Sequence, residues 1–137
     1  MRKFLIASHG TFASGIKSSL EIIAGTFEQV YTIDAYGSNE ITIEEEMDTV
    51  LNQLGEEDEL IIFTDLAGGS VTNRILVKSH QTNIYLVAGL NLPLLLEVVL
   101  AEPDIPVPEV IETAIVHARE QIMDIKQWIA ENQELTD

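Results

Sequence analysis

The sequence predicts an α/β fold, a three-layer sandwich in which a doubly wound, mainly parallel sheet carries helices on both faces. Four short apolar segments recur along the chain, and segments with helical spacing of apolar residues separate them. Regular alternation of strands and helices is typical of parallel sheets, because parallel strands need a long crossover connection. The apolar segments show little alternation with polar residues, which is typical of strands covered on both faces.

The first predicted strand, residues 3–8, reads KFLIAS. Segments 29–34 (QVYTID), 60–64 (LIIFT) and 83–88 (NIYLVA) are the other three, and they are rich in β-branched and aromatic residues. We expect the strand order 2-1-3-4, which reverses between the first and third strands. Ligands of such sheets bind where the order reverses, beyond the carboxyl ends of the strands. The loops that follow these two strands should therefore meet at one crevice.

The first two helices are predicted by periodicity and by end signals. Phe12, Ile16, Leu20 and Ile23 recur at helical spacing after the first strand, and Gly25 is suited to end that helix. A capping box, TIEE at residues 42–45, opens the second helix. Its expected apolar stripe continues through the following turns: Ile43, Met47, Val50 or Leu51, and Leu54.

The remaining helices follow the third and fourth strands. One is expected over residues 70–80, and a short one begins after Asn91 as N-cap, with Pro93 in its first turn. A proline-rich connection, EPDIPVPEV at 102–110, comes next. Beyond it apolar residues repeat at spacings of 4 and 3 and predict one long helix packed on the core: Ile111, Ile115, Ala118, Ile122, Ile125 and Ile129. The last residues, 131–137, are expected to fray.

Composition limits the classes of function. Seven basic and 23 acidic residues give a formal charge of −16, which disfavours nucleic acid and anionic membranes as partners. This charge either favours a basic protein partner or serves solubility alone. The absence of cysteine excludes disulfides and cysteine nucleophiles, and no apolar run reaches the roughly 18 residues of a membrane span. We expect residues 1–137 to form a single cytoplasmic domain.

His9 stands where the first strand gives way to the first helix. A helix N-terminus leaves backbone amides unpaired and attracts anions. A neutral imidazole can attack a phosphoryl donor and form a phosphohistidine. Gly10 would allow close approach of the backbone, and four following amides would bind the phosphate. These belong to Thr11, Phe12, Ala13 and Ser14. A histidine that only caps the helix is the alternative.

Asp65 follows the third strand and is expected at the same crevice. A carboxylate bonded to one ring nitrogen fixes the tautomer and leaves the other nitrogen free to attack. Gly68, Gly69 and Ser70 add amides and a hydroxyl to a phosphate site nearby. The alternatives are an ordinary turn aspartate and a serine that caps the third helix. No nucleotide-binding glycine motif or zinc-binding motif is present, so neither a cofactor nor a metal is expected.

Three motifs, each directly after a predicted strand, identify a family. They are SHG at 8–10, TDLAGGSVTN at 64–73 and AGLNLPLL at 88–95. With them the chain resembles, over nearly its whole length, the IIA component (EIIA) of the mannose-class sugar phosphotransferase system. The resemblance implies a phosphotransferase in which His9 accepts a phosphoryl group from the phosphocarrier HPr and passes it to a histidine of a IIB protein (EIIB). It also implies that Asp65 orients His9, that Ser70 belongs to the phosphate loop, and that a membrane IIC/IID pair moves the sugar.

The resemblance further implies a homodimer, which in the better-known member exchanges a fifth strand. No such strand can be placed here, because everything after Glu109 has a helical pattern. Thr11 and Ala67 stand where the best-known member has tryptophans, which would alter partner fit more than chemistry. A phosphoryl donor to dihydroxyacetone kinase, a non-catalytic regulatory module and a small-ligand binding domain remain alternatives. The sequence does not indicate which sugar is carried.

Overall fold

The computed structural model describes residues 1–37 and 40–136, with side chains through 133. Its four strands are β1 (Arg2–His9), β2 (Val30–Ala35), β3 (Glu59–Thr64) and β4 (Ile84–Val87). They form one sheet in the order β2-β1-β3-β4, and every pairing is parallel. The predicted strand order is therefore confirmed, and the described sheet is parallel throughout.

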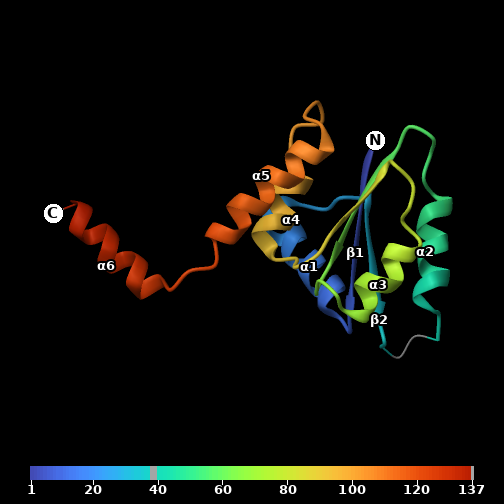
Figure 1. Cartoon of the computed structure of the whole chain (residues 1–137), viewed down its shortest axis with the longest axis horizontal. Coiled ribbons are helices and arrows are strands. Elements are labelled where there is room, and N and C mark those ends of the chain that lie inside the picture. Colours follow the sequence, from blue (N-terminus) through green and yellow to red (C-terminus); the bar gives the residue numbers. More distant parts are fainter. Residues whose placement is uncertain (38–39, 137) are drawn as a thin grey trace.

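Helices cover both faces of this sheet, as predicted (Figure 1). One layer contains α1 (Phe12–Ala24), α4 (Leu92–Val99) and α5 (Val107–Glu120), which pack in one buried apolar cluster. The other layer contains α2 (Ile43–Asn52) and α3 (Ser70–Val77), which pack in a second cluster. The three-layer sandwich expected from the sequence is thus present.

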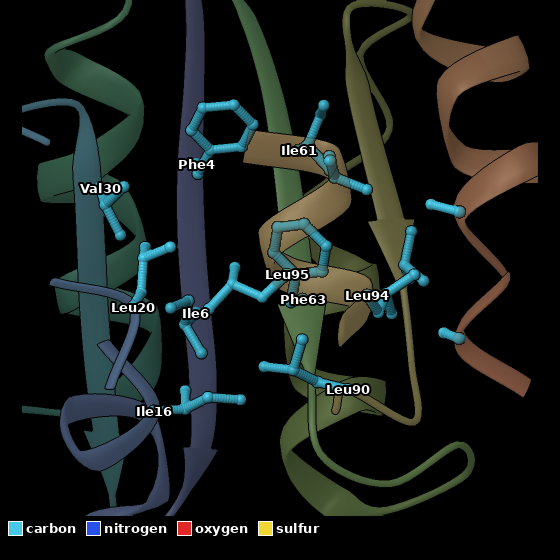
Figure 2. Close-up of a cluster of buried hydrophobic side chains, with 14 of the residues drawn as sticks. Phe4, Ile6, Ile16, Leu20, Val30, Ile61, Phe63, Leu90, Leu94 and Leu95 are labelled. Carbon is cyan, nitrogen blue, oxygen red and sulfur yellow. The ribbon is translucent and has the colours of Figure 1, made fainter. Parts of the chain in front are cut away.

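Successive residues of the central strands enter opposite layers. Phe4 and Ile6 of β1 belong to the first cluster, whereas Leu5 and Ala7 belong to the second. Figure 2 shows the first cluster, in which side chains of β1 and β3 meet those of α1 and α4. Because both faces are covered, strands of this kind are apolar along their whole length rather than alternating.

Three predicted helix ends are present in the structure. The Thr42 side chain accepts a hydrogen bond from the Glu45 amide at 3.1 Å and caps α2. The Asn91 side chain accepts one from the Leu94 amide at 3.0 Å and caps α4. Gly25 ends α1 with a positive φ of 92°, a conformation that glycine adopts without strain. The third helix, by contrast, ends at Val77 and not at residue 80.

The predicted buried stripe of α1 is partly wrong. Ile16 and Leu20 are buried, but the third buried residue of the helix is Ala13. Phe12 and Ile23 are 45% and 59% exposed. The small Ala13 lies next to the strand end, where its amide bonds to the buried Ser8 hydroxyl at 2.7 Å. Ala13 therefore takes the buried place in the first turn that was expected for Phe12.

The single long helix predicted near the C-terminus is wrong. The chain leaves α5 at Glu120, and a new helix, α6 (Ile125–Thr136), begins five residues later. Asp124 caps it, because its side chain accepts a hydrogen bond from the Gln127 amide at 3.2 Å. Figure 1 shows α6 standing away from the sandwich, and Ile125 and Trp128 are 57% and 50% exposed. The apolar spacing continues across the break, although only its first half packs on the core.

The described residues also bear on a fifth strand and on membrane-spanning helices. No fifth strand occurs among them, since α5 and α6 account for most of the segment after residue 106. None of their helices combines the length and hydrophobicity that crossing a bilayer requires.

Candidate active site

The structure brings His9 and Asp65 together at the carboxyl edge of the sheet. His9 is the last residue of β1, and Asp65 follows the last residue of the neighbouring β3. The backbone amide of His9 and its ring Nδ1 both lie 2.8 Å from Asp65 Oδ2. An ionised carboxylate only accepts hydrogen bonds, so Nδ1 carries a proton, and in the neutral form of the ring Nε2 is then the nitrogen with the free lone pair. The His9 side chain is 40% exposed, which leaves the ring accessible to a partner.

The charge of Asp65 is maintained by its neighbours. Burial opposes ionisation of this carboxyl, but hydrogen bonds from the amide and ring of His9 outweigh burial and hold its pKa below the usual value. The amide of Leu66 also donates to Oδ1 at 2.9 Å. Asp65 is therefore an anion at neutral pH, and it would stabilise positive charge on the His9 ring.

Most amides of the loop at residues 10–14 already have partners. The Gly10 amide donates to the Ala35 carbonyl at 2.7 Å, the Ala13 amide to Ser8 Oγ, and the Ser14 amide to Asp34 Oδ1 at 3.1 Å. Among the described residues, the amides of Thr11 and Phe12 have no hydrogen-bond partner. The expected set of free amides is thus reduced to two. Gly10 has a φ of +55°, which explains a glycine at this turn.

The loop after β3 approaches the His9 ring closely. Gly68 has a φ of +77°, and Gly69 caps α3. A Cβ on Gly69 would lie 3.2 Å from Leu66 Cβ, 3.3 Å from the Leu66 carbonyl oxygen and 3.6 Å from His9 Cε1. The absence of a side chain at residue 69 therefore lets the loop pack against the imidazole.

Ser70 lies on the open side of the ring. It is the first residue of α3, whose N-cap is Gly69, so the alternative role of Ser70 as a helix cap does not apply. Its Oγ is 3.5 Å from His9 Nε2. The buried Thr72 two residues later holds the loop in place, since its hydroxyl donates to the Leu66 carbonyl.

Tyr36 is a site residue that the sequence analysis missed. It follows β2, and its ring centroid lies 5.5 Å from that of His9. Its hydroxyl donates to Ser70 Oγ at 3.0 Å and accepts from Arg74 Nη1 at 3.1 Å. The sequence did contain a signal for its position. In the predicted order β2 is the neighbour of β1, so the residue that follows β2 lies at the same edge of the sheet as His9.

The other histidines lie away from this edge. His117 on α5 pairs with Glu97 of α4, and that contact raises the His117 pKa above its usual value. His80 lies beyond the end of α3. Within the described part of the chain, no three acidic or histidine side chains are grouped as a metal site would require.

Fold and site together define an α/β protein with a histidine–aspartate pair where the strand order reverses. Comparison with known proteins then identifies the family. The EIIA-man family model, described as the fructose IIA component of the phosphotransferase system (PTS), matches residues 3–115. The chain belongs to this family of PTS EIIA proteins.

Individual relatives agree with this assignment. The chain is 30% identical over 127 residues to the PTS system mannose-specific EIIAB component of Escherichia coli K12, covering 89% of this chain and 39% of that protein. It therefore spans about two fifths of the length of that relative. It is 29% identical over 100 residues to the PTS system fructose-specific EIIA component of Bacillus subtilis 168, covering 72% of this chain and 68% of the relative. The crystal structure of phosphotransferase system component EIIA from Streptococcus agalactiae superposes with a TM-score of 0.76 at 30% identity, covering 93% of this chain and 99% of that one.

The close approach of Gly69 predicts the effect of Gly69→Ala. The new methyl group would press on Leu66 and would touch the His9 ring at an ordinary contact distance, so we expect the loop to shift, the His9 Cε1–H resonance to move in NMR spectra, and stability to fall. Gly15→Ala is the matched control, since no atom lies within 4 Å of its Cβ position inside α1. It should gain about 0.5–1 kcal/mol of unfolding free energy. An unchanged His9 resonance in Gly69→Ala would contradict the packing described.

Proposed function

We propose that this chain is the cytoplasmic IIA phosphoryl carrier of a sugar phosphotransferase system, and that residues 1–137 act as one EIIA domain. His9 accepts a phosphoryl group from phospho-HPr and passes it to a histidine of an EIIB protein. Family membership supports the general role. The single observation that carries the proposal is the hydrogen bond between Nδ1 and Asp65, which leaves Nε2 as the nucleophile.

The transfer step balances with two imidazoles. Nε2 of His9 attacks the phosphorus of the donor phosphohistidine, and a new N–P bond forms as the donor N–P bond breaks. The electron pair of the broken bond returns to the donor nitrogen. No proton leaves Nε2, because the proton of the neutral ring is on Nδ1. Asp65 stabilises the positive charge that develops on the His9 ring. In a second transfer a histidine nitrogen of EIIB attacks the phosphorus, the His9 N–P bond breaks, and its electron pair returns to Nε2.

Phosphoryl oxygens have a small set of donors in this site. The unpaired amides of Thr11 and Phe12 lie at the start of α1, where the helix dipole favours negative charge. The Ser70 hydroxyl lies near Nε2 on the opposite loop. We assign the engaged amides of Gly10, Ala13 and Ser14 to shaping the first loop, and Gly68 and Gly69 to bringing the second loop close.

The protein partners would bind over the exposed His9 edge. Phe12 begins α1, and Leu66 follows Asp65 in the loop after β3. They are 45% and 59% exposed and offer an apolar contact surface. Thr11 and Ala67 beside them are exposed. We propose HPr and EIIB as the direct partners, with an EIIC/EIID membrane pair served through EIIB.

Phosphorylation by phosphoenolpyruvate, enzyme I and HPr tests the proposal. We expect label on His9 in the wild type, none in His9→Ala, and transfer of the label onward when EIIB is added. Asp65→Asn should fold but accept the group about 100-fold more slowly, because its side chain no longer selects the reactive tautomer. His80→Ala and His117→Ala are the matched controls and should label normally.

Four outcomes would contradict the assignment. Label on His80 or His117 would place the nucleophile elsewhere, and an unchanged rate in Asp65→Asn would remove this carboxylate from the mechanism. Label that stays on His9 with EIIB present, or that passes to dihydroxyacetone kinase instead, would support the regulatory or the kinase-donor alternative.

We also propose that the chain is a homodimer, with α6 contacting a second copy. Ile125, Trp128 and Ile129 are exposed on one side of this 12-residue helix, which stands away from the sandwich. Isolated helices of this length are marginally stable in water, so α6 needs a packing partner. A second copy fits the homodimer that the resemblance implies.

Sedimentation of two variants tests the dimer. Trp128→Asp places a charge on the apolar side of α6, and we expect it to convert a dimer into a monomer. Gln127→Asp adds the same charge at the neighbouring, exposed position and should leave the dimer intact. A wild type that sediments as a monomer at all concentrations would contradict the proposal.

A further inference from the structure

A series of hydrogen bonds leads from a cation to the reactive nitrogen. Arg74 Nη1 donates to the Tyr36 hydroxyl at 3.1 Å, and this hydroxyl donates to Ser70 Oγ at 3.0 Å. Ser70 Oγ in turn lies 3.5 Å from His9 Nε2. A guanidinium can donate hydrogen bonds but cannot accept them. The hydrogen bonds of the series therefore all run in one direction, from Arg74 toward the imidazole of His9. Such series polarise each hydrogen bond along them.

Arg74 is held in place from the other side. Its Nε donates to Glu44 Oε1 of α2 at 2.8 Å, and its Nη2 pairs with the second oxygen. The hydrogen bond to Arg74 lowers the pKa of Glu44 to about 2, so this pair stays charged over the physiological range. Its guanidinium carbon also lies 5.7 Å from the centre of the Tyr36 ring, within reach of a cation–π contact.

The backbone at Tyr36 is strained. Its φ is +61°, the one positive value among the described non-glycine residues. A bulky side chain rarely occupies this region, and residues in such conformations cluster at functional sites. The positive φ falls on Tyr36 and not on the adjacent Gly37, although glycine adopts this conformation without strain. This turn directs the phenol toward His9 and Ser70.

We propose that Tyr36 is a phosphoryl-binding residue and that Arg74 is the positioning residue that orients and polarises its hydroxyl. The inference rests on the proposed function, because it needs a phosphoryl group on Nε2. Once Nε2 is bonded to phosphorus it no longer accepts a hydrogen bond, and the hydroxyls of Ser70 and Tyr36 turn to the phosphoryl oxygens.

The charge of the site makes this contribution necessary. The Asp65 carboxylate is already hydrogen-bonded to the His9 ring, and the Asp34 carboxylate is hydrogen-bonded to an amide at the start of α1. A phosphoryl group adds further negative charge to the same edge of a chain with net charge −16. Arg74 supplies positive charge that reaches the phosphoryl group through the Tyr36 hydroxyl. Its ion pair with Glu44 prevents the guanidinium from binding the phosphoryl group directly and more tightly. A carrier must release the group, so an indirect contact suits transfer.

The equilibrium of phosphoryl exchange with HPr tests the inference. We expect Tyr36→Phe and Arg74→Gln each to shift this equilibrium toward phospho-HPr by about tenfold, which corresponds to about 1.4 kcal/mol. Arg74→Lys should recover part of the shift, since it restores the charge without the planar fork. Loss of a purely structural contact would lower the unfolding temperature without moving the exchange equilibrium.

Two matched controls exist in the chain. Lys78→Gln removes another cation that pairs α3's C-terminal end with α2, through Asp48 at 3.0 Å, and its side chain is 35% exposed, as is that of Arg74. Tyr31→Phe removes a phenol hydroxyl from β2. Both should exchange as the wild type does.

The outcomes separate the two proposals. A wild type that is not phosphorylated on His9 would overturn the proposed function and this inference with it. A wild type that is phosphorylated normally, with Tyr36→Phe and Arg74→Gln within twofold of their controls, would overturn this inference alone. Should Arg74→Gln unfold, Tyr36→Phe decides, since it keeps the ring and loses one oxygen atom.

Discussion

The hydrogen bonds from His9 to Asp65 are the constraint on which the rest of the site depends. One carboxylate oxygen accepts from both the backbone amide and the ring of His9, so the strand end and the imidazole are held by the same atom. This arrangement selects the Nδ1–H tautomer and points Nε2 outward, where the ring is partly exposed. Without it His9 would be one more histidine at a helix start. With it the ring has a defined orientation, which the proposed role as a nucleophile requires.

The fold supplies the rigidity that this contact needs. His9 and Asp65 terminate or directly follow the two central strands, whose interior residues are buried on both faces. The polar groups at these strand ends are buried and bonded: Ser8 accepts from the amide of Ala13, and Thr64 lies 2.8 Å from Thr72 Oγ1. The loops that follow these strand ends contain several glycines and few large side chains, which lets both loops approach the His9 imidazole. The family model of the EIIA-man proteins matches residues 3–115, which include both of these loops.

Much of the fold and the central pair could be predicted from the sequence. Continuous apolar strands determined the layers, and the strand order then placed residues 9 and 65 together. Local spacing could not reveal the break at Asp124, because the apolar pattern continues through it into a helix that does not pack on the core. It also could not show which loop amides have partners, since Ala35 and Asp34 come from another strand. The strand order could have placed Tyr36 at this edge of the sheet, but its orientation toward His9 goes with a backbone conformation that tyrosine seldom adopts.

Nitrogen-15 NMR of the His9 ring tests the central claim most directly. In the unphosphorylated protein at neutral pH, we expect the proton on Nδ1, with Nε2 at the chemical shift of an unprotonated nitrogen. After phosphorylation, coupling to phosphorus should appear at Nε2 while Nδ1 keeps its proton. A proton on Nε2 before transfer, or phosphorus bonded to Nδ1 after it, would contradict the account.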